Sequence, residues 1–531
     1  MPRVVPGQRK RAYRPKTKTG CVTFRRVKCD EGRPSCQRCV STGRRCDGYA
    51  EESSDSPASS NSDFNDDETS TALIQSPSSS VILASDRERE AFYFFVNMTA
   101  PMMGGFGKES CWSEMIPRAA HHEPSIRHAV IALGALHHSK ERSSRSTSSN
   151  KLFSSAEEQF PLLEYNRAIK CLVEPFAKKE RQAMDVCLIN CVLFSAFEMM
   201  QGNYGHGAAH QESGSKILCE ITYDENSQRY YHDSLKTSNY PYLPMSLLEE
   251  LYLRSDFVLT QMTDSFDQSL YNKFKGSHFT AHPPAMFTSL SQARNSLHFF
   301  WSRFRIDLNN LNCQLDSLEL NQRFHDWQME VIQFAHKWLF AFQAFILKYG
   351  DTFSEADKIG AAILQIQSHC GYMNARVPRD VKDNQMLWDP FLSVFEKITM
   401  LSEEVISNPA FATTVFQIDM GVIGPLYQVV GACRHPIVRR KAIALLERVP
   451  SLQEGIWNAG MTARVGRRLI ELEEYGIEDV REAADIPDWA RISDMEPDFE
   501  KDGRRVTLTY KRSDRAGGPL VRNKITETFE W

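Results

Sequence analysis

Residues 20–49 read GCVTFRRVKCDEGRPSCQRCVSTGRRCDGY, and this stretch decides how the N-terminal part of the chain folds. It holds five of the chain's 13 cysteines, namely Cys21, Cys29, Cys36, Cys39 and Cys46. The last four follow the spacing C-x6-C-x2-C-x6-C, in which short loops let thiolates converge on a zinc ion. Because large apolar residues are few here, metal binding has to supply the folding free energy. The stretch therefore predicts a zinc site.

Charge is divided unevenly along the chain. Residues 1–50 carry 14 Lys/Arg against 3 Asp/Glu, a net charge of +11, whereas the whole chain has −4. A basic head on an acidic body predicts a polyanion as the partner of the head alone. The alternative interpretation is a solvated basic tail.

A basic arm, residues 1–20, precedes the cysteines. Its exposed positive charge suits a nuclear import signal or phosphate contacts, and the sequence does not separate the two roles. The residues concerned are Arg9, Lys10, Arg11, Arg14, Lys16 and Lys18. The arm lacks the apolar segment of a secretory signal, and no run of 18 uncharged apolar residues predicts a membrane span. We therefore expect no membrane partner and a reducing compartment, in which the other cysteines are buried thiols.

The rest of the chain is predicted to be mostly helical. Residues 50–86 mix Ser, Asp, Glu and Pro, which predicts a disordered linker. Beyond residue 87, apolar residues recur at helical spacing, and Pro124 begins one helix. The further helical stretches are 161–175, 181–201, 206–221, 246–263, 322–349, 355–372, 386–406, 436–448 and 457–474, and the expected breaks are Gly202-Asn203, Gly350-Asp351, Pro409, Pro425 and Pro436.

The C-terminal residues change pattern once more. Residues 506–510 and 525–530 alternate between apolar and polar positions, with Gly517-Gly518 between them, which predicts a β-hairpin. The predicted fold class is thus mostly α: a zinc-cluster domain (21–49), a large all-helical body of αα-hairpins (87–500) and a C-terminal β-hairpin (501–531). No sustained heptad follows the cysteines, so no coiled-coil dimeriser is predicted there, and a homodimer stays an open question.

The cysteine-rich stretch resembles the fungal binuclear zinc cluster (six-cysteine) transcription factor family. That family has the pattern C-x2-C-x6-C-x5-12-C-x2-C-x6-8-C, and Lys28-Cys29-Asp30 and Pro34 match its flanking words. The resemblance implies that six thiolates hold two zinc ions, bridged by the first and fourth cysteines. This chain departs from the pattern, because Phe24 stands at the second cysteine and Cys29 follows Cys21 by eight positions rather than ten.

Carried over residue by residue, the resemblance implies unequal zinc sites. One zinc keeps all four ligands, Cys21, Cys36, Cys39 and Cys46. The other keeps Cys21, Cys29 and Cys36, which is not the closed tetrahedral arrangement of a structural zinc site. Two accounts fit: a natural variant with weakened binding, or a gene-model artefact in which a misplaced splice junction dropped three codons around Phe24. The intact flanks favour the second account.

The same resemblance implies a role for the basic residues in this stretch. In the family, a short helix before the third cysteine enters the major groove and reads CGG-type triplets. Its base-contacting charges correspond to Arg25, Arg26 and Lys28, because Arg and Lys bond the O6 and N7 atoms of guanine. Phosphate contacts, which add affinity without sequence information, correspond to Arg33, Arg38, Arg44 and Arg45.

The body is similar to the fungal-specific regulatory region that follows such clusters. The matching words include Arg127-His128-Ala129-Val130 and Cys433-Arg434-His435-Pro436. Histidines between His121 and His138 have no Cys or carboxylate at ligand spacing, so we interpret them as packing and surface residues rather than a metal site. The chain has no G-x-S-x-G elbow, Walker A loop or dinucleotide fingerprint, so we expect that it is not an enzyme.

Together these observations predict a nuclear, zinc-dependent, sequence-specific DNA-binding transcription factor of the RNA polymerase II type. Its partners are double-stranded DNA and the transcription machinery, and the resemblance implies control of secondary-metabolite or nutrient genes. The alternative hypothesis is a regulatory interaction protein that does not bind DNA and whose zinc cluster is vestigial.

Overall fold

A computed structural model of the chain describes residues 37–41, 85–106, 111–145, 155–259, 270, 273, 282–312, 317–377, 384–411, 414–455, 457–499, 505–513 and 522–530. The chain divides into two compact units, Met1–Pro77 and Ser78–Trp531. In the first unit the described residues form helix α1 (Gln37–Ser41). The basic arm lies outside the described residues, and so does the predicted linker up to residue 84.

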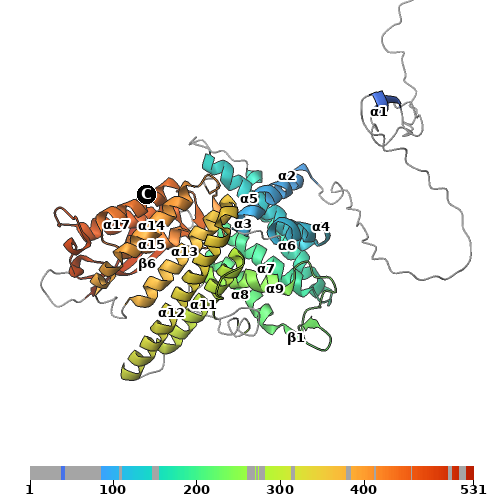
Figure 1. Cartoon of the computed structure of the whole chain (residues 1–531). Coiled ribbons are helices and arrows are strands. Elements are labelled where there is room, and N and C mark those ends of the chain that lie inside the picture. The colour runs from blue at the N-terminus through green and yellow to red at the C-terminus, as the bar shows by residue number, and fades with distance from the viewer. Residues whose placement is uncertain are drawn as a thin grey trace, which may run out of the picture. The chain divides into compact units, whose positions relative to one another are not determined.

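The second unit begins with helices that pack around a first apolar core (Figure 1). Ser85 starts α2, because its side chain accepts from the Glu88 amide (3.2 Å) and Glu88 accepts from the Ser85 amide in return (3.1 Å). Pro124 begins α5, as predicted. The elements are α2 (Asp86–Phe94), π-helix η3 (Phe95–Thr99), α3 (Ala100–Gly104), π-helix η4 (Cys111–Met115), α4 (Ile116–His122), α5 (Pro124–Arg145), α6 (Ser155–Ala177), α7 (Met184–Gln201), α8 (Tyr204–Glu220), β1 (Thr222–Asp224), β2 (Arg229–Tyr231) and α9 (Met245–Leu259).

Helix α7 is the centre of this first core. Its sequence is apolar on every side, and 94% of it is buried inside the body. Among the described helices, α7 is the one that is long and apolar enough to cross a membrane, judged by length and composition alone. A helix that is hydrophobic all round also suits the interior of a large protein, which is where α7 lies. Gly202 ends it in the left-handed conformation (φ 83°).

A second apolar core follows, built from later helices and the C-terminal strands. Helices α11 and α12 lie side by side as a long pair (Figure 1). The elements are α11 (Leu290–Asn312), α12 (Ser317–Tyr349), 3-10 helix η5 (Gly350–Thr352), α13 (Glu355–Arg376), 3-10 helix η7 (Gln385–Phe391), α14 (Leu392–Ser407), β3 (Phe416–Gln417), α15 (Ile423–Ala432), α16 (Pro436–Arg448), β4 (Gln453–Glu454), β5 (Trp457–Asn458), α17 (Ala459–Glu474), and 3-10 helices η8 (Ala483–Asp485) and η9 (Asp488–Ala490).

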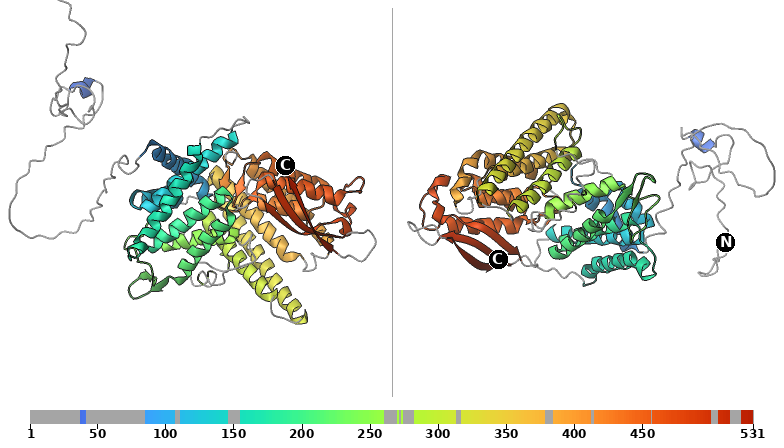
Figure 2. Two further views of the ribbon diagram at one scale, coloured as in Figure 1. Left: turned by 180° about the vertical axis from the view of Figure 1, so that it is seen from behind. Right: turned by 90° about the horizontal axis from the view of Figure 1, so that it is seen from below.

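An antiparallel sheet closes the chain at one end of the body, and α2–α9 lie at the other end (Figure 2). Its strands are β6 (Ser493–Phe499), β7 (Arg505–Ser513) and β8 (Arg522–Glu530), in that order. The predicted hairpin is confirmed as β7 and β8, with Val506 opposite Phe529 and Tyr510 opposite Ile525. The structure adds β6, which the sequence analysis missed because its charged residues and Pro497 do not alternate.

The mostly α fold class is confirmed, and every predicted helical stretch contains a helix. The body also holds short strands, β1 to β5, so it is not purely helical. One predicted break was wrong, and one long helix was not predicted. Pro425 does not separate helices, because it lies in the first turn of α15, where its missing N–H costs nothing. Helix α11 was missed because polar side chains, among them Arg294 and His298, are buried on its inner face.

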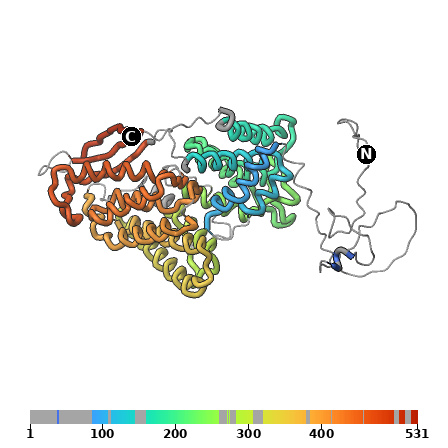
Figure 3. The backbone as a smooth tube through the Cα atoms, turned by 90° about the horizontal axis from the view of Figure 1, so that it is seen from above, coloured from blue at the N-terminus to red at the C-terminus, as the bar shows by residue number. Residues whose placement is uncertain are grey.

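Figure 3 shows the helices of the two cores meeting within the body. Side chains from each half pack into the core of the other. Phe106, from the segment after α3, packs into the second core, and Phe416 of β3 packs into the first. Arg254 of α9 forms a buried ion pair with Asp419 (Nε to Oδ1, 3.1 Å) and also bonds the carbonyl of Gly104 (3.3 Å). Because a buried charge is costly unless it is paired, this contact ties the two cores together.

Candidate metal centre and the buried charge network

The candidate metal centre is represented in the structure by α1. This helix starts directly after Cys36 in the sequence and carries Cys39. The Cys39 side chain is 0% exposed, whereas Gln37 and Ser41, on either side of it, are exposed. A completely buried thiol in a stretch with few large apolar residues is what inward-pointing metal ligation requires.

Most of the predicted site residues lie outside the described residues. Of the predicted zinc ligands only Cys39 is described, and of the predicted DNA contacts only the backbone of Arg38, within α1. Cys21, Cys29, Cys36, Cys46, the other predicted DNA contacts and the import residues stay predictions. The same holds for the consequences of Phe24.

The residues present fit a zinc ion. Thiolates are preferred zinc ligands, and C-x2-C spacing across the start of a short helix is common in structural zinc sites. The stretch supplies five cysteines, of which the described one is buried. A zinc ion held there would cross-link loops that have little apolar surface of their own, and so would supply their folding free energy.

The described residues of the body offer no comparable centre. Within the described part of the chain, no group of three or more His, Cys, Asp or Glu side chains is arranged to hold a metal. Two of the histidines of residues 121–138 pack instead: His128 contacts the buried Glu164 (Nδ1 to Oε2, 2.6 Å) and His137 contacts Thr99 (Nδ1 to Oγ1, 3.0 Å), while His122 is exposed. These contacts agree with the predicted packing role.

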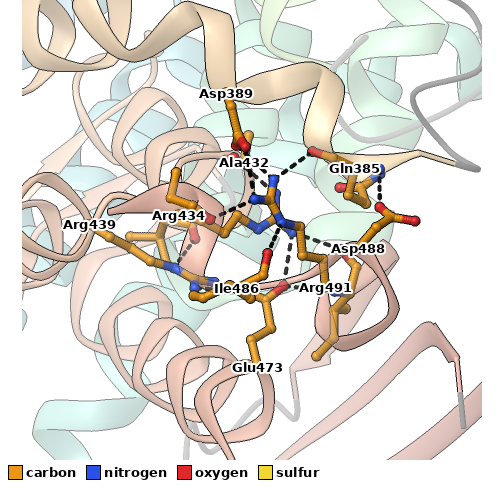
Figure 4. A network of polar contacts seen from close by, with 12 residues as sticks. Gln385, Asp389, Ala432, Arg434, Arg439, Glu473, Ile486, Asp488 and Arg491 are labelled. Carbon is orange, nitrogen blue, oxygen red and sulfur yellow. Dashed lines mark hydrogen bonds and ion pairs between the residues drawn. The ribbon is translucent and has the colours of Figure 1, made fainter. Parts of the chain in front are cut away.

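A buried charge network holds the second core together (Figure 4). Glu473 of α17 lies between two guanidinium groups, accepting from Arg434 at Oε1 (2.9 Å) and from Arg439 at Oε2 (2.6 Å). The amide of Ile492 donates to Oε1 as well (2.7 Å). All three charged side chains are at most 1% exposed. Arg434 and Arg439 also donate to backbone carbonyls near the end of α15, so the carboxylate connects α15, α16, α17 and the start of the sheet.

A third arginine, Arg491, extends the network toward the C-terminal sheet. The guanidinium of Arg491 binds both oxygens of Asp389 (2.7 and 2.8 Å) and donates to three carbonyls, those of Gln385, Ala483 and Ile486. Figure 4 shows acceptors from Asp389, Gln385 and Ile486 gathered around the Arg491 guanidinium. Bidentate, charge-assisted bonds of this kind fix orientation as well as distance.

Electrostatics keeps Glu473 ionised. Burial by itself would raise the pKa of this carboxyl group, but Arg434, Arg439 and the Ile492 amide lower the pKa to about 2. The network therefore carries its full charge at neutral pH. Truncating one partner would leave an uncompensated buried charge, which is strongly destabilising.

The sequence contained a signal for this network that the sequence analysis did not interpret. Cys433-Arg434-His435-Pro436 is one of the stretches that carry the resemblance, and the structure shows what two of these residues do. Arg434 binds Glu473, and Pro436 begins α16 immediately after the arginine. The available signal was Arg434, a charged residue between two apolar helical stretches. Its partner Glu473 lies 39 residues away, so the sequence pattern does not reveal the pair.

Comparisons with known proteins identify the cysteine-rich stretch. The family model of the fungal Zn(2)-Cys(6) binuclear cluster domain matches residues 20–56. No solved structure matches the chain.

The chain is also similar to three fungal regulators. The aspercryptin biosynthesis cluster-specific transcription regulator atnN of Emericella nidulans is 30% identical over 225 residues, which are 39% of this chain and 35% of the relative. The transcription regulator lscL of Purpureocillium lilacinum is 30% identical over 209 residues, 37% of this chain and 47% of the relative. The Zn(2)-C6 fungal-type transcription factor afumD of Aspergillus fumigatus is 37% identical over 131 residues, 24% of this chain and 33% of the relative.

These alignments span between a third and a half of the relatives' lengths. The relatives' names describe transcription regulators, and a zinc cofactor agrees with the cysteine chemistry. Residues 20–56 therefore match the fungal Zn(2)-Cys(6) binuclear cluster domain, a zinc-binding domain, and the chain is similar over part of its length to proteins named as transcription regulators.

Proposed function

We propose that the chain is a nuclear, zinc-dependent regulator of RNA polymerase II transcription that binds DNA in a sequence-specific manner. The observation that carries the proposal is the basic, five-cysteine stretch inside a matched Zn(2)-Cys(6) domain. Its net charge of +11 over residues 1–50 suits a polyanion, and the acidic remainder does not. The relatives named as transcription regulators support the same class of function, and they support no enzymatic activity.

The zinc sites in this proposal are unequal. Cys21, Cys36, Cys39 and Cys46 hold one zinc with a complete set of four thiolates. The second zinc has three ligands, because Phe24 stands in place of a cysteine. The burial of Cys39 supports the complete site, since this cysteine belongs to that site and not to the other.

Recognition of DNA follows from the charges around these ligands. Arg25, Arg26 and Lys28 read the bases of CGG-type half-sites, while Arg33, Arg38, Arg44 and Arg45 contact phosphates. The basic arm serves nuclear import. The body, residues 87–500, regulates the output and contacts the transcription machinery, and the target is a secondary-metabolite biosynthesis gene cluster. The name of the Emericella nidulans relative supports this last point.

Fluorescence anisotropy with the zinc-loaded full chain and a CGG-containing duplex tests the proposal. Binding should weaken steeply with salt, because each neutralised phosphate releases counterions. A duplex with scrambled triplets is the control and should bind with the weaker, sequence-independent affinity. Zinc measured per chain should lie nearer to one than to two.

The second candidate function is a regulatory interaction protein that does not bind DNA, and the departure at Phe24 favours it. A matched variant decides between the two. Phe24→Cys with two residues inserted before Cys29 restores the family's spacing. If the natural chain fails to bind and the restored chain binds, the interaction protein is the correct function for this chain. If both bind specifically, the missing ligand is tolerated.

A further inference from the structure

A cavity of about 280 Å³ lies where the two cores of the body meet. One wall comes from η3, α3 and α5 and includes Met98 and Met102. The opposite wall comes from α13 and the segment between α14 and α15 and includes Ile359, Ile363 and Phe411. An apolar cavity of about 150 Å³ binds benzene, so this one has room for a molecule of two fused rings.

The backbone on one side of the cavity is unusual. Residues 95–99 form the π-helix η3, a rare conformation that is found mostly as single turns at functional sites. Gly105, just after α3, also lines the cavity and has a φ of 66°. These two features turn the chain away from regular helical packing and leave the space open.

A polar anchor lies in the cavity wall. His137 is 3% exposed, and its Nδ1 pairs with Thr99 Oγ1 at 3.0 Å. No hydrogen-bond partner for its Nε2 occurs among the residues that the structure describes. Burial lowers the pKa of His137 to about 4, so the ring is neutral at pH 7. A ring nitrogen in the cavity wall can bond a polar atom of a bound molecule.

The charge of the lining selects the ligand. Two carboxylates, Glu141 and Asp419, line the cavity, and none of the described lining residues is Lys or Arg. Asp419 is already neutralised by Arg254. The described lining thus offers no cation to an anionic ligand, and its surface is mostly apolar, with His137 beside a few other polar side chains such as Asn97 and Gln417. We propose that this cavity binds an uncharged, mainly apolar molecule of two rings whose single polar atom bonds Nε2 of His137.

Such a ligand would touch both cores at once. Because it binds the folded body and not the unfolded chain, it would raise the melting temperature, by an amount that grows with the logarithm of its concentration above the Kd. It would also add a contact between the two halves of the body, next to the Arg254–Asp419 pair. This binding does not depend on whether the zinc cluster binds DNA.

The test uses the zinc-loaded full chain and prodan, an uncharged fluorescent naphthalene ketone. Ala356 and Ala410 line the cavity and are exposed, so Ala356→Trp and Ala410→Trp should close its mouth without disturbing either core. Ala209 is an exposed alanine of α8 that does not line the cavity, and Ala209→Trp is the matched control. We expect saturable, blue-shifted prodan emission that both plugging variants weaken about tenfold and the control leaves unchanged. No saturable binding, or equal binding by all variants, would overturn the proposal.

A second measurement tests the anchor and the charge preference. His137→Phe should weaken the binding of 2-acetylnaphthalene several-fold more than that of naphthalene, and His137→Gln should restore much of the difference. 2-Naphthalenesulfonate should fail to displace prodan, because the described lining has no Lys or Arg to pair with the sulfonate. An unchanged ratio in His137→Phe, or effective displacement by the sulfonate, contradicts the assigned ligand class.

Discussion

The cysteine-rich stretch and the helical body are stabilised in different ways. The stretch has few large apolar residues. Among its described side chains, the one that is fully buried is the thiol of Cys39. The body excludes water from two apolar cores and adds paired charges such as Glu473 with Arg434. One region therefore depends on a metal ion for its folding free energy, and the other depends on burial. It follows that each can be perturbed without the other.

Metal removal should produce the largest effect and should be confined to the cysteine-rich stretch. Structural zinc contributes on the order of 10 kcal/mol to small domains, so chelation should unfold residues 20–56 and abolish any DNA binding. The melting temperature of the body, followed by circular dichroism of the full chain, should stay unchanged. A large fall in that temperature would show that the body depends on the metal too.

Cysteine substitutions test the same difference between the cysteine-rich stretch and the body. Cys39→Ser should lower the zinc content of the purified chain, whereas Cys171→Ser, a partly exposed cysteine of α6, should leave it unchanged. Zinc measured by mass spectrometry separates the two variants. Equal zinc content in both would remove Cys39 from the ligand set.

Breaking the charge network should give the next largest effect, confined to the body. Glu473→Gln leaves two buried guanidinium groups without their counter-charge, at a cost of about 3 to 5 kcal/mol. The melting temperature should fall while zinc content is unchanged. Glu447→Gln is the control, because Glu447 pairs with Arg467 near the surface, where such pairs contribute about 0 to 1 kcal/mol.

The same carboxylate predicts an acid dependence. Its pKa is lowered from an ordinary 4.5 to about 2 in the folded chain, so its stabilising contribution is complete above pH 4.5 and is lost as the pH falls toward 2. Unfolding by urea at several pH values measures this. Glu473→Gln should show a shallower loss of stability over that window, and an identical slope would mean that Glu473 is not the group responsible.

Local sequence patterns predicted most of the helices and the C-terminal hairpin. They did not predict which residues far apart in the sequence pair with each other. Helices such as α16 follow from apolar spacing and a starting proline, which are properties of neighbouring residues. Helix α11 was missed because burial of Arg294 and His298 depends on residues far along the chain. The same limit applies to sites: the zinc ligands are visible as spacing, but the pairing of Arg434 with Glu473 and the cavity beside His137 arise only when the cores meet.

Packing density offers a finer test within a single helix of the body. Gly214 of α8 lies against Tyr252, and a Cβ at this position would overlap the tyrosine ring. Tyr252 is fully buried and donates to the carbonyl of Leu188 (3.0 Å), so it has little freedom to move. Gly214→Ala should therefore destabilise the body by about 1 to 3 kcal/mol, measured by urea unfolding. A neutral result would show that the core around Tyr252 is loosely packed.

Gly205, in the first turn of the same helix, should respond in the opposite direction. Its backbone is helical, and nothing lies within 4 Å of the position a Cβ would take. Gly205→Ala should stabilise the body by about 0.5 kcal/mol, because alanine restricts the unfolded chain without a clash. Both substitutions replace glycine with alanine in the same helix. If their effects on the free energy of unfolding differ in sign, the difference arises from packing and not from helix propensity. If both substitutions destabilised the body, α8 would need flexibility at its start, and burial alone would not explain the stability of the body.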